Sequence, residues 1–113
     1  MSASAFPAFV QRLPEAEIPL AGFQGWLLQG REGQVLFNES KRELNIPEHV
    51  HGDQWGIVVD GQIDLTIAGE TRTYVRGDSY FIPAGTKHEA LIHPGFRAID
   101  FFADHDRYHP RPE

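Results

Sequence analysis

Cysteine is absent from the sequence. Without it the chain forms no disulfide bond, offers no thiolate to a metal and has no cysteine nucleophile. Any metal ion that the protein binds must therefore be held by nitrogen and oxygen ligands. A chain without disulfides is also typical of a reducing compartment, and we expect this one in the cytoplasm.

Positive charge is scarce as well. The chain has 10 Lys and Arg against 16 Asp and Glu, which gives a formal net charge of -6. Such a balance repels phosphate backbones and anionic lipid surfaces, and it supplies no counterion release to drive binding. We therefore expect no nucleic-acid partner and no membrane partner.

Long apolar runs are missing too. No stretch approaches the roughly 20 apolar residues of a membrane-spanning helix. The first twenty residues lack the basic start and apolar core of a secretion signal, since Pro7, Pro14 and Glu15 interrupt them. We expect a soluble protein that is not exported.

The chain length allows one domain. A chain of 113 residues leaves no room for a second domain with its own core. We expect a single domain over 1–113, with an N-terminal arm to about residue 22, a barrel core at about 26–103 and a frayed tail at 104–113. Helical segments are expected only around Ala5–Gln11 and, as one turn, near Asp104–Tyr108.

Short apolar runs fill the sequence beyond the arm. They are separated by Gly, Pro or Asp, and several alternate with polar residues, which is a strand pattern. The expected strands are Trp26–Gln29, Gln34–Phe37, Trp55–Val59, Ile63–Ile67, Thr71–Val75, Ser79–Ile82, His88–Ile92 and Arg97–Phe102. Many short strands of this kind indicate an all-β barrel or sandwich.

Three turns punctuate the middle of the chain. They are Asp60–Gly61, Ala68–Glu70 and Arg76–Asp78, and each contains the glycine that tight turns favour. We expect all three to be hairpin-like connections, so that this part of the chain is antiparallel.

Three histidines and a glutamine form a candidate metal site. His49 and His51 leave the same face of an extended segment, because side chains alternate along a strand. Gln54 opens the next apolar run, and the turn at Pro83–Lys87 delivers His88 at the start of another strand. Three imidazoles and one amide oxygen suit a borderline divalent ion. Taken singly, each of these residues is more often a surface or structural residue.

The spacing of these residues resembles the cupin family. The first cupin motif, G-x5-H-x-H-x3,4-E-x6-G, matches at His49, His51, Gln54 and Gly61. Gln54 replaces the usual Glu, only two residues separate it from His51, and Glu43 stands where the leading Gly would fall.

The second motif of the same family is the more specific match. Its pattern, G-x5-P-x-G-x2-H-x3-N, matches at Gly77, Pro83, Gly85 and His88, with Ile92 at the last position instead of Asn. The resemblance covers roughly residues 45–92. It implies an antiparallel double-stranded β-helix, the jelly-roll barrel of the cupins.

The resemblance also implies a ligand set. It assigns His49, His51, Gln54 and His88 to one divalent transition metal: Fe, Mn, Zn, Ni or Co. Asp53 is the competing candidate for the fourth position, because a carboxylate is a stronger ligand and a bulge in the short turn would aim it inward. His93, His105 and His109 fit neither motif, and we expect them at the surface.

Four neutral ligands have a chemical consequence. They leave the ion its full double charge, which favours a small anionic molecule that chelates through two oxygens. With Fe(II) and O2 such a centre supports a dioxygenase, and with other metals an isomerase, cyclase or decarboxylase. A non-catalytic module that binds or senses a small molecule is the alternative, because the sequence shows no clear general acid or base outside the ligand set. Asp100 is a candidate only by its position on the last strand. A barrel without metal is a third possibility.

Alternation also predicts which face of the strand after His51 is buried. With Gln54 inside, Gly56 and Val58 face the interior as well. The outer face carries the apolar residues Trp55, Ile57 and Val59.

An apolar outer face needs a cover. We expect a homodimer, because cupins that resemble this chain commonly pair through a sheet face. The other possibility is that the N-terminal arm covers it with Phe6, Phe9, Val10 and Leu13.

Overall fold

The computed structural model describes residues 6–112, which contain nine strands and one short helix. The elements are α1 (Ala8–Gln11), β1 (Phe23–Gln29), β2 (Gln34–Ser40), β3 (Leu44–His49), β4 (Gln54–Asp60), β5 (Gln62–Ile67), β6 (Glu70–Val75), β7 (Ser79–Ile82), β8 (His88–Ile92) and β9 (Phe96–Phe102). The fold is therefore all-β, as the sequence predicts.

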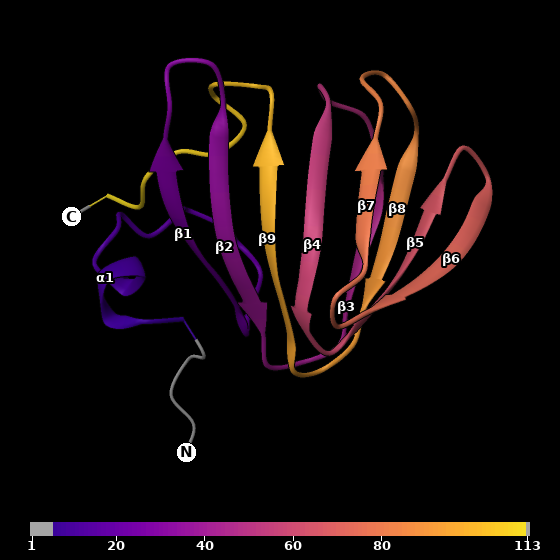
Figure 1. Ribbon diagram of the computed structural model, residues 1–113, viewed down its shortest axis with the longest axis horizontal. Coiled ribbons are helices and arrows are strands. Elements are labelled where there is room, and N and C mark those ends of the chain that lie inside the picture. Colours follow the sequence, from indigo (N-terminus) through magenta and orange to yellow (C-terminus); the bar gives the residue numbers. More distant parts are fainter. Residues whose placement is uncertain (1–5, 113) are drawn as a thin grey trace.

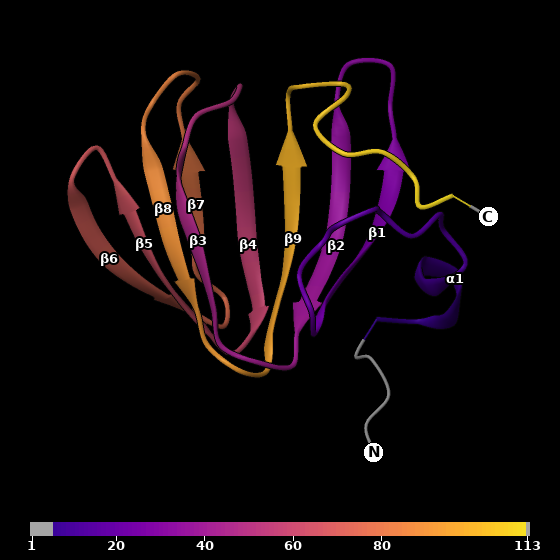
Figure 2. The same cartoon turned by 180° about the vertical axis from the view of Figure 1, so that it is seen from behind.

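The strands form two sheets that enclose a common interior (Figures 1 and 2). One sheet has the order β1-β2-β9-β4-β7 and the other has the order β3-β8-β5-β6. Every strand pair is antiparallel. The two sheets, with chain-distant neighbours such as β2 and β9, are the expected jelly-roll barrel.

Only one of the three expected hairpins is a hairpin. β5 and β6 pair with each other, and the turn between them has positive φ at Ala68 and Gly69. The turns that contain Gly61 and Gly77 instead carry the chain from one sheet to the other, so two hairpin predictions are wrong. A glycine with positive φ serves a corner as well as a hairpin, and local sequence does not distinguish them.

Two further local predictions need correction. The strand β3 was not among the predicted strands, because Pro47 and flanking polar residues weaken its pattern; Pro47 is tolerated since β3 is an edge strand. The segment Asp104–Tyr108 contains turns and bends rather than a helical turn. The expected N-terminal helix is present at Ala8–Gln11, and Ala5 lies outside the described residues.

The core lies between the sheets. Its largest cluster of buried side chains is Leu44, Val58, Ile63, Leu65, Tyr80, Ile82, Ala90, Ile92, Phe96 and Ala98. Alternation along β4 follows the prediction: Gly56 and Val58 are buried and Gln54 is half-buried, whereas Trp55 is exposed on the other face.

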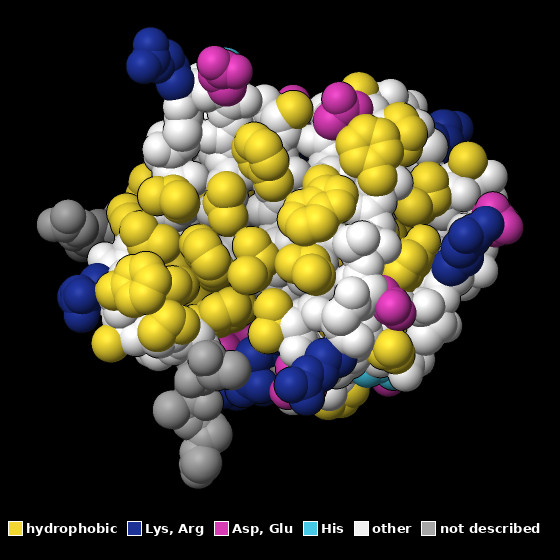
Figure 3. All heavy atoms as spheres, in the orientation of Figure 1, with side chains coloured by type: hydrophobic (Ala, Val, Ile, Leu, Met, Phe, Trp, Pro, Cys, Tyr) yellow, Lys and Arg dark blue, Asp and Glu magenta, His cyan; other side chains and the backbone are white. Residues whose placement is uncertain are grey.

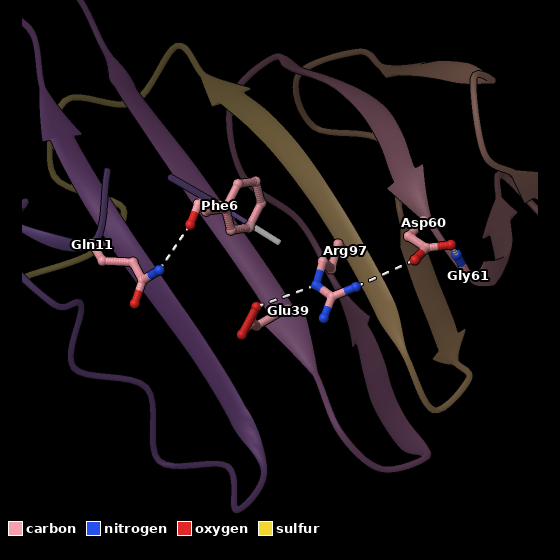
Figure 4. A network of polar contacts seen from close by, with 6 residues as sticks. All are labelled: Phe6, Gln11, Glu39, Asp60, Gly61 and Arg97. Atoms are coloured by element: carbon pink, nitrogen blue, oxygen red, sulfur yellow. Dashed lines mark hydrogen bonds and ion pairs between the residues drawn. The ribbon is translucent and has the colours of Figure 1, made fainter. Parts of the chain in front are cut away.

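The N-terminal arm covers one part of the outer face of the five-stranded sheet. The ring of Phe6 packs edge-on against Trp26 at 6.0 Å and against Phe37 at 5.7 Å. Val10 is buried in the same cluster, and Gln11 Nε2 donates a 2.7 Å hydrogen bond to the Phe6 carbonyl (Figure 4). Phe9 does not contribute, because it is 66% exposed.

A charged bridge crosses the same sheet beside the arm. Arg97 on β9 donates from Nε to Glu39 on β2 over 3.4 Å and from Nη1 to Asp60 on β4 over 3.2 Å (Figure 4). The three side chains connect neighbouring strands near the end of the barrel opposite the candidate metal site.

Apolar side chains also gather on the part of that face beside the arm, where they are open to solvent (Figure 3). Leu28, Val35, Phe101, Trp55 and Phe81 are successive register partners across β1, β2, β9, β4 and β7. We call these five residues the apolar row. Four of them are between 44% and 54% exposed, Val35 being the exception. Among the described residues, no helix is long and apolar enough to cross a membrane.

Candidate metal centre

The strand ends bring the candidate ligands to one end of the barrel. β3 ends at His49, β4 begins at Gln54 and β8 begins at His88, and these three ends lie together at the top of Figure 1. His49 and His88 are register partners between β3 and β8. Gln54 is the partner of Phe102 at the end of β9. Antiparallel pairing therefore gathers residues that are far apart in the sequence.

The three histidines form one cluster. Each offers a ring nitrogen that lies within 4.8 Å of those of the other two. The Nε2 atoms of His51 and His88 are 3.1 Å apart, and the rings of His49 and His88 have centroids 4.2 Å apart. His88 is buried, whereas His49 and His51 are half-buried.

Backbone carbonyls orient all three rings. Nδ1 of His49 contacts the Pro47 carbonyl at 2.8 Å, Nδ1 of His51 contacts the Gly52 carbonyl at 2.8 Å, and Nδ1 of His88 contacts the Thr86 carbonyl at 2.9 Å. A carbonyl oxygen only accepts, so each Nδ1 carries the proton and each Nε2 keeps a lone pair. This is the arrangement in which proteins hold metal-ligating histidines.

The short distance between His51 and His88 fits a shared ion. Two lone pairs 3.1 Å apart repel each other unless a cation or proton lies between them. Two imidazole nitrogens on one ion, each about 2.0–2.1 Å from it, lie roughly 3 Å apart when they are at right angles. The donor set and its spacing are therefore suited to a divalent ion.

The surroundings of His51 and His88 favour the neutral form of both rings. Burial lowers the pKa of His51 below 6.5, and the charge of Arg107 lowers it further. The pKa of His88 is also lowered, mainly by burial, with contributions from His49 and Arg107. Neutral imidazole is the form that binds metal, because a protonated ring has no free lone pair.

Gln54 and Asp53 lie in different surroundings. Gln54 lines the cavity that contains the three histidines. Asp53 is exposed, and its Oδ1 accepts a 2.7 Å hydrogen bond from the backbone N–H of Ala84. The short turn between His51 and Gln54 thus changes the parity of the alternation, and it brings the amide rather than the carboxylate to the cavity wall.

A buried carboxylate lies behind Gln54. Asp100 accepts hydrogen bonds from Gln54 Nε2 at 2.9 Å, from the Tyr80 hydroxyl at 2.7 Å and from Asn38 Nδ2 at 2.9 Å. Burial raises the pKa of Asp100, while these three donors act in the opposite direction. Burial together with the charge of Asp100 raises the pKa of Tyr80 well above its usual value.

Gly56 leaves the space that this polar cluster occupies. A Cβ atom at position 56 would overlap the Asp100 carboxylate and the Tyr80 ring. The glycine is therefore a packing requirement of the site wall.

The cavity has a volume of about 320 Å³ and is mostly apolar. Its polar lining residues are Asn38, His49, His51, Gln54, Tyr80, His88, Asp100, Arg107 and Tyr108. The sequence did not indicate Arg107, Tyr108, Tyr80 or Asn38. Arg107 and Tyr108 come from the segment that follows β9, where the sequence carries no motif.

The other three histidines are outside this cluster. His93 contacts Asp64 at 2.7 Å and is half-buried, and His105 and His109 are exposed. None of them lines the cavity. His105 and His109 therefore lie at the surface as expected, whereas His93 is only half-exposed.

Comparison with known proteins gives the family. Residues 35–101 match the sequence profile of the Cupin domain, which covers more than half of the chain. The chain belongs to the cupin family. It is also 41% identical over 56 residues to quercetin 2,3-dioxygenase from Bacillus subtilis (strain 168), but this match spans 48% of the chain and only 16% of that enzyme.

Solved structures agree on the fold. An RmlC-like cupin from Shewanella frigidimarina NCIMB 400 has a TM-score of 0.73 at 24% identity, covering 88% of this chain and 90% of that one. KdgF from Halomonas sp. has a TM-score of 0.68 at 24% identity, with 87% of each chain covered. Salicylate 1,2-dioxygenase from Pseudoaminobacter salicylatoxidans has a TM-score of 0.67 at 14% identity, covering 76% of this chain and 26% of that one.

Proposed function

We propose that this cupin holds one divalent transition-metal ion and uses it to act on a small anionic molecule that chelates through oxygen. The observation that carries the proposal is the histidine cluster. His49, His51 and His88 present ring nitrogens within 4.8 Å of one another, and each ring is fixed through Nδ1 by a backbone carbonyl. A structural role would not require three unprotonated Nε2 atoms to converge.

Gln54 is the fourth ligand in this proposal. It lines the cavity, and its amide nitrogen is taken up by Asp100, which leaves Oε1 to coordinate. Asp53 is the weaker candidate, because its carboxylate already accepts from Ala84 at the surface.

Bound metal would supply Lewis-acid polarisation or, with iron, access to O2 chemistry. The chain's own residues supply the rest. Three imidazoles and one amide add no negative charge, so the site attracts an anionic ligand. Apolar side chains such as Ile82 and Phe96 line the cavity and limit the entry of water. The names of two relatives, quercetin 2,3-dioxygenase and salicylate 1,2-dioxygenase, support dioxygenase chemistry as the first reaction to test.

The test begins with protein purified without added metal. Its metal content is measured, and O2 consumption is then followed with a panel of catechols and of 1,2- and 1,3-dicarbonyls. Bound iron with turnover supports the dioxygenase. Turnover without O2 uptake supports an isomerase, cyclase or decarboxylase. Bound metal with ligand binding but no turnover would make the protein a binding or sensing module.

A matched set of variants ties the result to the cluster. His49→Ala, His51→Ala and His88→Ala should each lose most of the metal, whereas His105→Ala, which removes an exposed imidazole, should keep it. Full metal content in all three cluster variants would refute the proposal.

We also propose that two copies pair through the apolar row. The arm already buries the neighbouring part of this face with Phe6 and Val10, but Trp55 and Phe101 stay outside its reach. The row crosses all five strands without a charged residue. The same row of a second copy, related by a two-fold axis, can therefore pack against it without burying a charge. Sheet faces that pack in this way bury apolar side chains from both partners.

A further inference from the structure

Arg107 is an unpaired cation in the wall of the metal-site cavity. Its Nε atom is buried and has no hydrogen-bond partner among the described residues. None of the ion pairs found within residues 6–112 includes its guanidinium group. A buried donor without a partner is costly, so it calls for an explanation such as a bound water, ion or ligand.

The nearby carboxylates are already occupied. Asp104 accepts a 2.8 Å hydrogen bond from the backbone N–H of Gly52. Asp100 receives its three hydrogen bonds from Tyr80, Gln54 and Asn38. Among the described residues, neither carboxylate forms an ion pair with Arg107.

Arg107 lies close to the metal site. Its Cζ atom is 5.7 Å from the centre of the Phe102 ring, and the same ring lies 5.5 Å from the ring of His51. One phenyl side chain therefore contacts both the guanidinium group and a candidate metal ligand.

The guanidinium group is held in place by the chain around it. Its Cζ atom stacks 4.8 Å from the centre of the Tyr108 ring. The backbone of Tyr108 is fixed in turn by the buried side chain of Gln34, which accepts from its N–H at 2.9 Å and donates to its carbonyl at 2.8 Å. Arg107 is thus a positioned residue, and its free donors are fixed at the cavity wall.

We propose that Arg107 binds a carboxylate group of the substrate, at the opposite end of the molecule from the oxygens that chelate the metal. The substrate class is then an oxygen chelator with a second, distant carboxylate. The planar guanidinium group matches a carboxylate through two parallel hydrogen bonds, and its Nη groups can donate them because no ion pair of the described residues includes them. This inference rests on the proposed function, because it takes the metal site as the other anchor.

The test uses pairs of ligands that differ only in the distant carboxylate. The pairs are 2-oxoglutarate with 2-oxopentanoate, and 2-oxoadipate with 2-oxohexanoate. Their affinities for the metal-loaded protein are measured by calorimetry, so the readout does not depend on turnover. In at least one pair the dicarboxylate should bind about ten- to a hundredfold more tightly, as expected for hydrogen bonds between charged groups.

Variants test whether Arg107 causes the difference in affinity between dicarboxylate and monocarboxylate. Arg107→Gln should abolish the preference for the dicarboxylate while leaving the affinity for the monocarboxylate nearly unchanged. Arg107→Lys, which keeps the charge but not the fork, should retain part of the preference. Arg76→Gln removes an exposed arginine and should change neither affinity.

Two results would overturn the inference. One is equal binding of both members in both pairs, and the other is an equal loss of affinity for both members in Arg107→Gln. Metal content, measured on each sample, separates this failure from failure of the proposed function: a wild-type protein that holds no metal defeats the metal site itself. Thermal unfolding of each variant shows whether a loss of ligand affinity comes from misfolding. If Arg107→Gln is misfolded, the affinities of Arg107→Lys test the inference instead.

Discussion

Gln54 Nε2 donates a 2.9 Å hydrogen bond to Oδ1 of Asp100. The contact turns the amide nitrogen of Gln54 towards Asp100, and Oε1 stays free of this hydrogen bond. Asp100 is fixed in turn by Tyr80 and Asn38. A buried carboxylate thus sets the orientation of the residue that we propose as the fourth metal ligand.

Removing the charge of Asp100 should loosen the metal without unfolding the protein. In Asp100→Asn the residue keeps its shape, but it no longer offers two acceptor oxygens, so the Gln54 amide can reverse. We expect a loss of about tenfold or more in metal affinity, as is typical of groups that support a ligand. Competition with a chelator measures the affinity.

Asp64→Asn is the matched control for that variant. Asp64 lies on the outer face and bonds to His93 and Thr73, away from the cavity. The control should bind metal like the wild type. Equal affinities for Asp100→Asn and the wild type would show that Asp100 does not position Gln54.

Gly56→Ala should destabilise the barrel. The added Cβ overlaps the Asp100 carboxylate and the Tyr80 ring, both of which are fixed by hydrogen bonds in a packed interior. We expect a loss of about 1–3 kcal/mol in the free energy of unfolding, measured in urea. A Cβ atom at position 25 would overlap less, since its nearest neighbours are Leu36 Cδ1 at 2.8 Å and Ile18 Cδ1 at 3.2 Å, so the loss in Gly25→Ala should be smaller. The reverse order would contradict this account of Gly56.

Asp64 gives a prediction about pH. Hydrogen bonds from His93 and Thr73 lower its pKa below the ordinary value of 3.8. A lowered carboxyl pKa stabilises the folded state above the ordinary pKa, and this contribution is lost as the pH falls through the folded-state pKa.

The comparison of Asp64→Asn with the wild type measures this effect. The wild type should be the more stable at pH 6, by less than about 1 kcal/mol because the site is near the surface. The difference should shrink as the pH falls below about 3.8. A difference that grows on acidification would reverse the assigned sign.

The apolar row predicts an oligomer. Sedimentation of the wild type at micromolar concentration should show a dimer. Phe101→Glu places a charge in the middle of the row and should shift the protein towards monomer. Val75→Glu changes an exposed apolar residue on β6, outside the row, and should leave the dimer intact. A monomeric wild type would rule out the proposed interface.

Much of the fold was predictable, because period-two alternation records which residues face the core. Along β4 the pattern placed Gly56 and Val58 inside and Trp55 outside, and the structure agrees. Which strands pair with each other was harder to predict from the sequence. The turn at Gly61 looks like a hairpin turn but joins strands of different sheets, since pairing depends on contacts distant in sequence.

The candidate site was also predictable only in part. The two motifs indicated His49, His51 and His88, and the structure brings them together from the end of β3, the segment after it and the start of β8. Arg107 carried no such indication. It reaches the cavity because Gln34, on the distant strand β2, bonds to the backbone of Tyr108, and no local pattern of residues encodes that contact.

The central claim is that the three histidines bind one metal ion. X-ray absorption at the K-edge of the metal in the purified protein measures the ligands directly. We predict three imidazole nitrogens and additional oxygen at about 2.0–2.2 Å, as for a first-row divalent ion. His88→Ala, which removes the buried member of the cluster, should lose one imidazole or the metal altogether. A wild-type spectrum with no imidazole around the metal, or one that His88→Ala leaves unchanged, would contradict the claim.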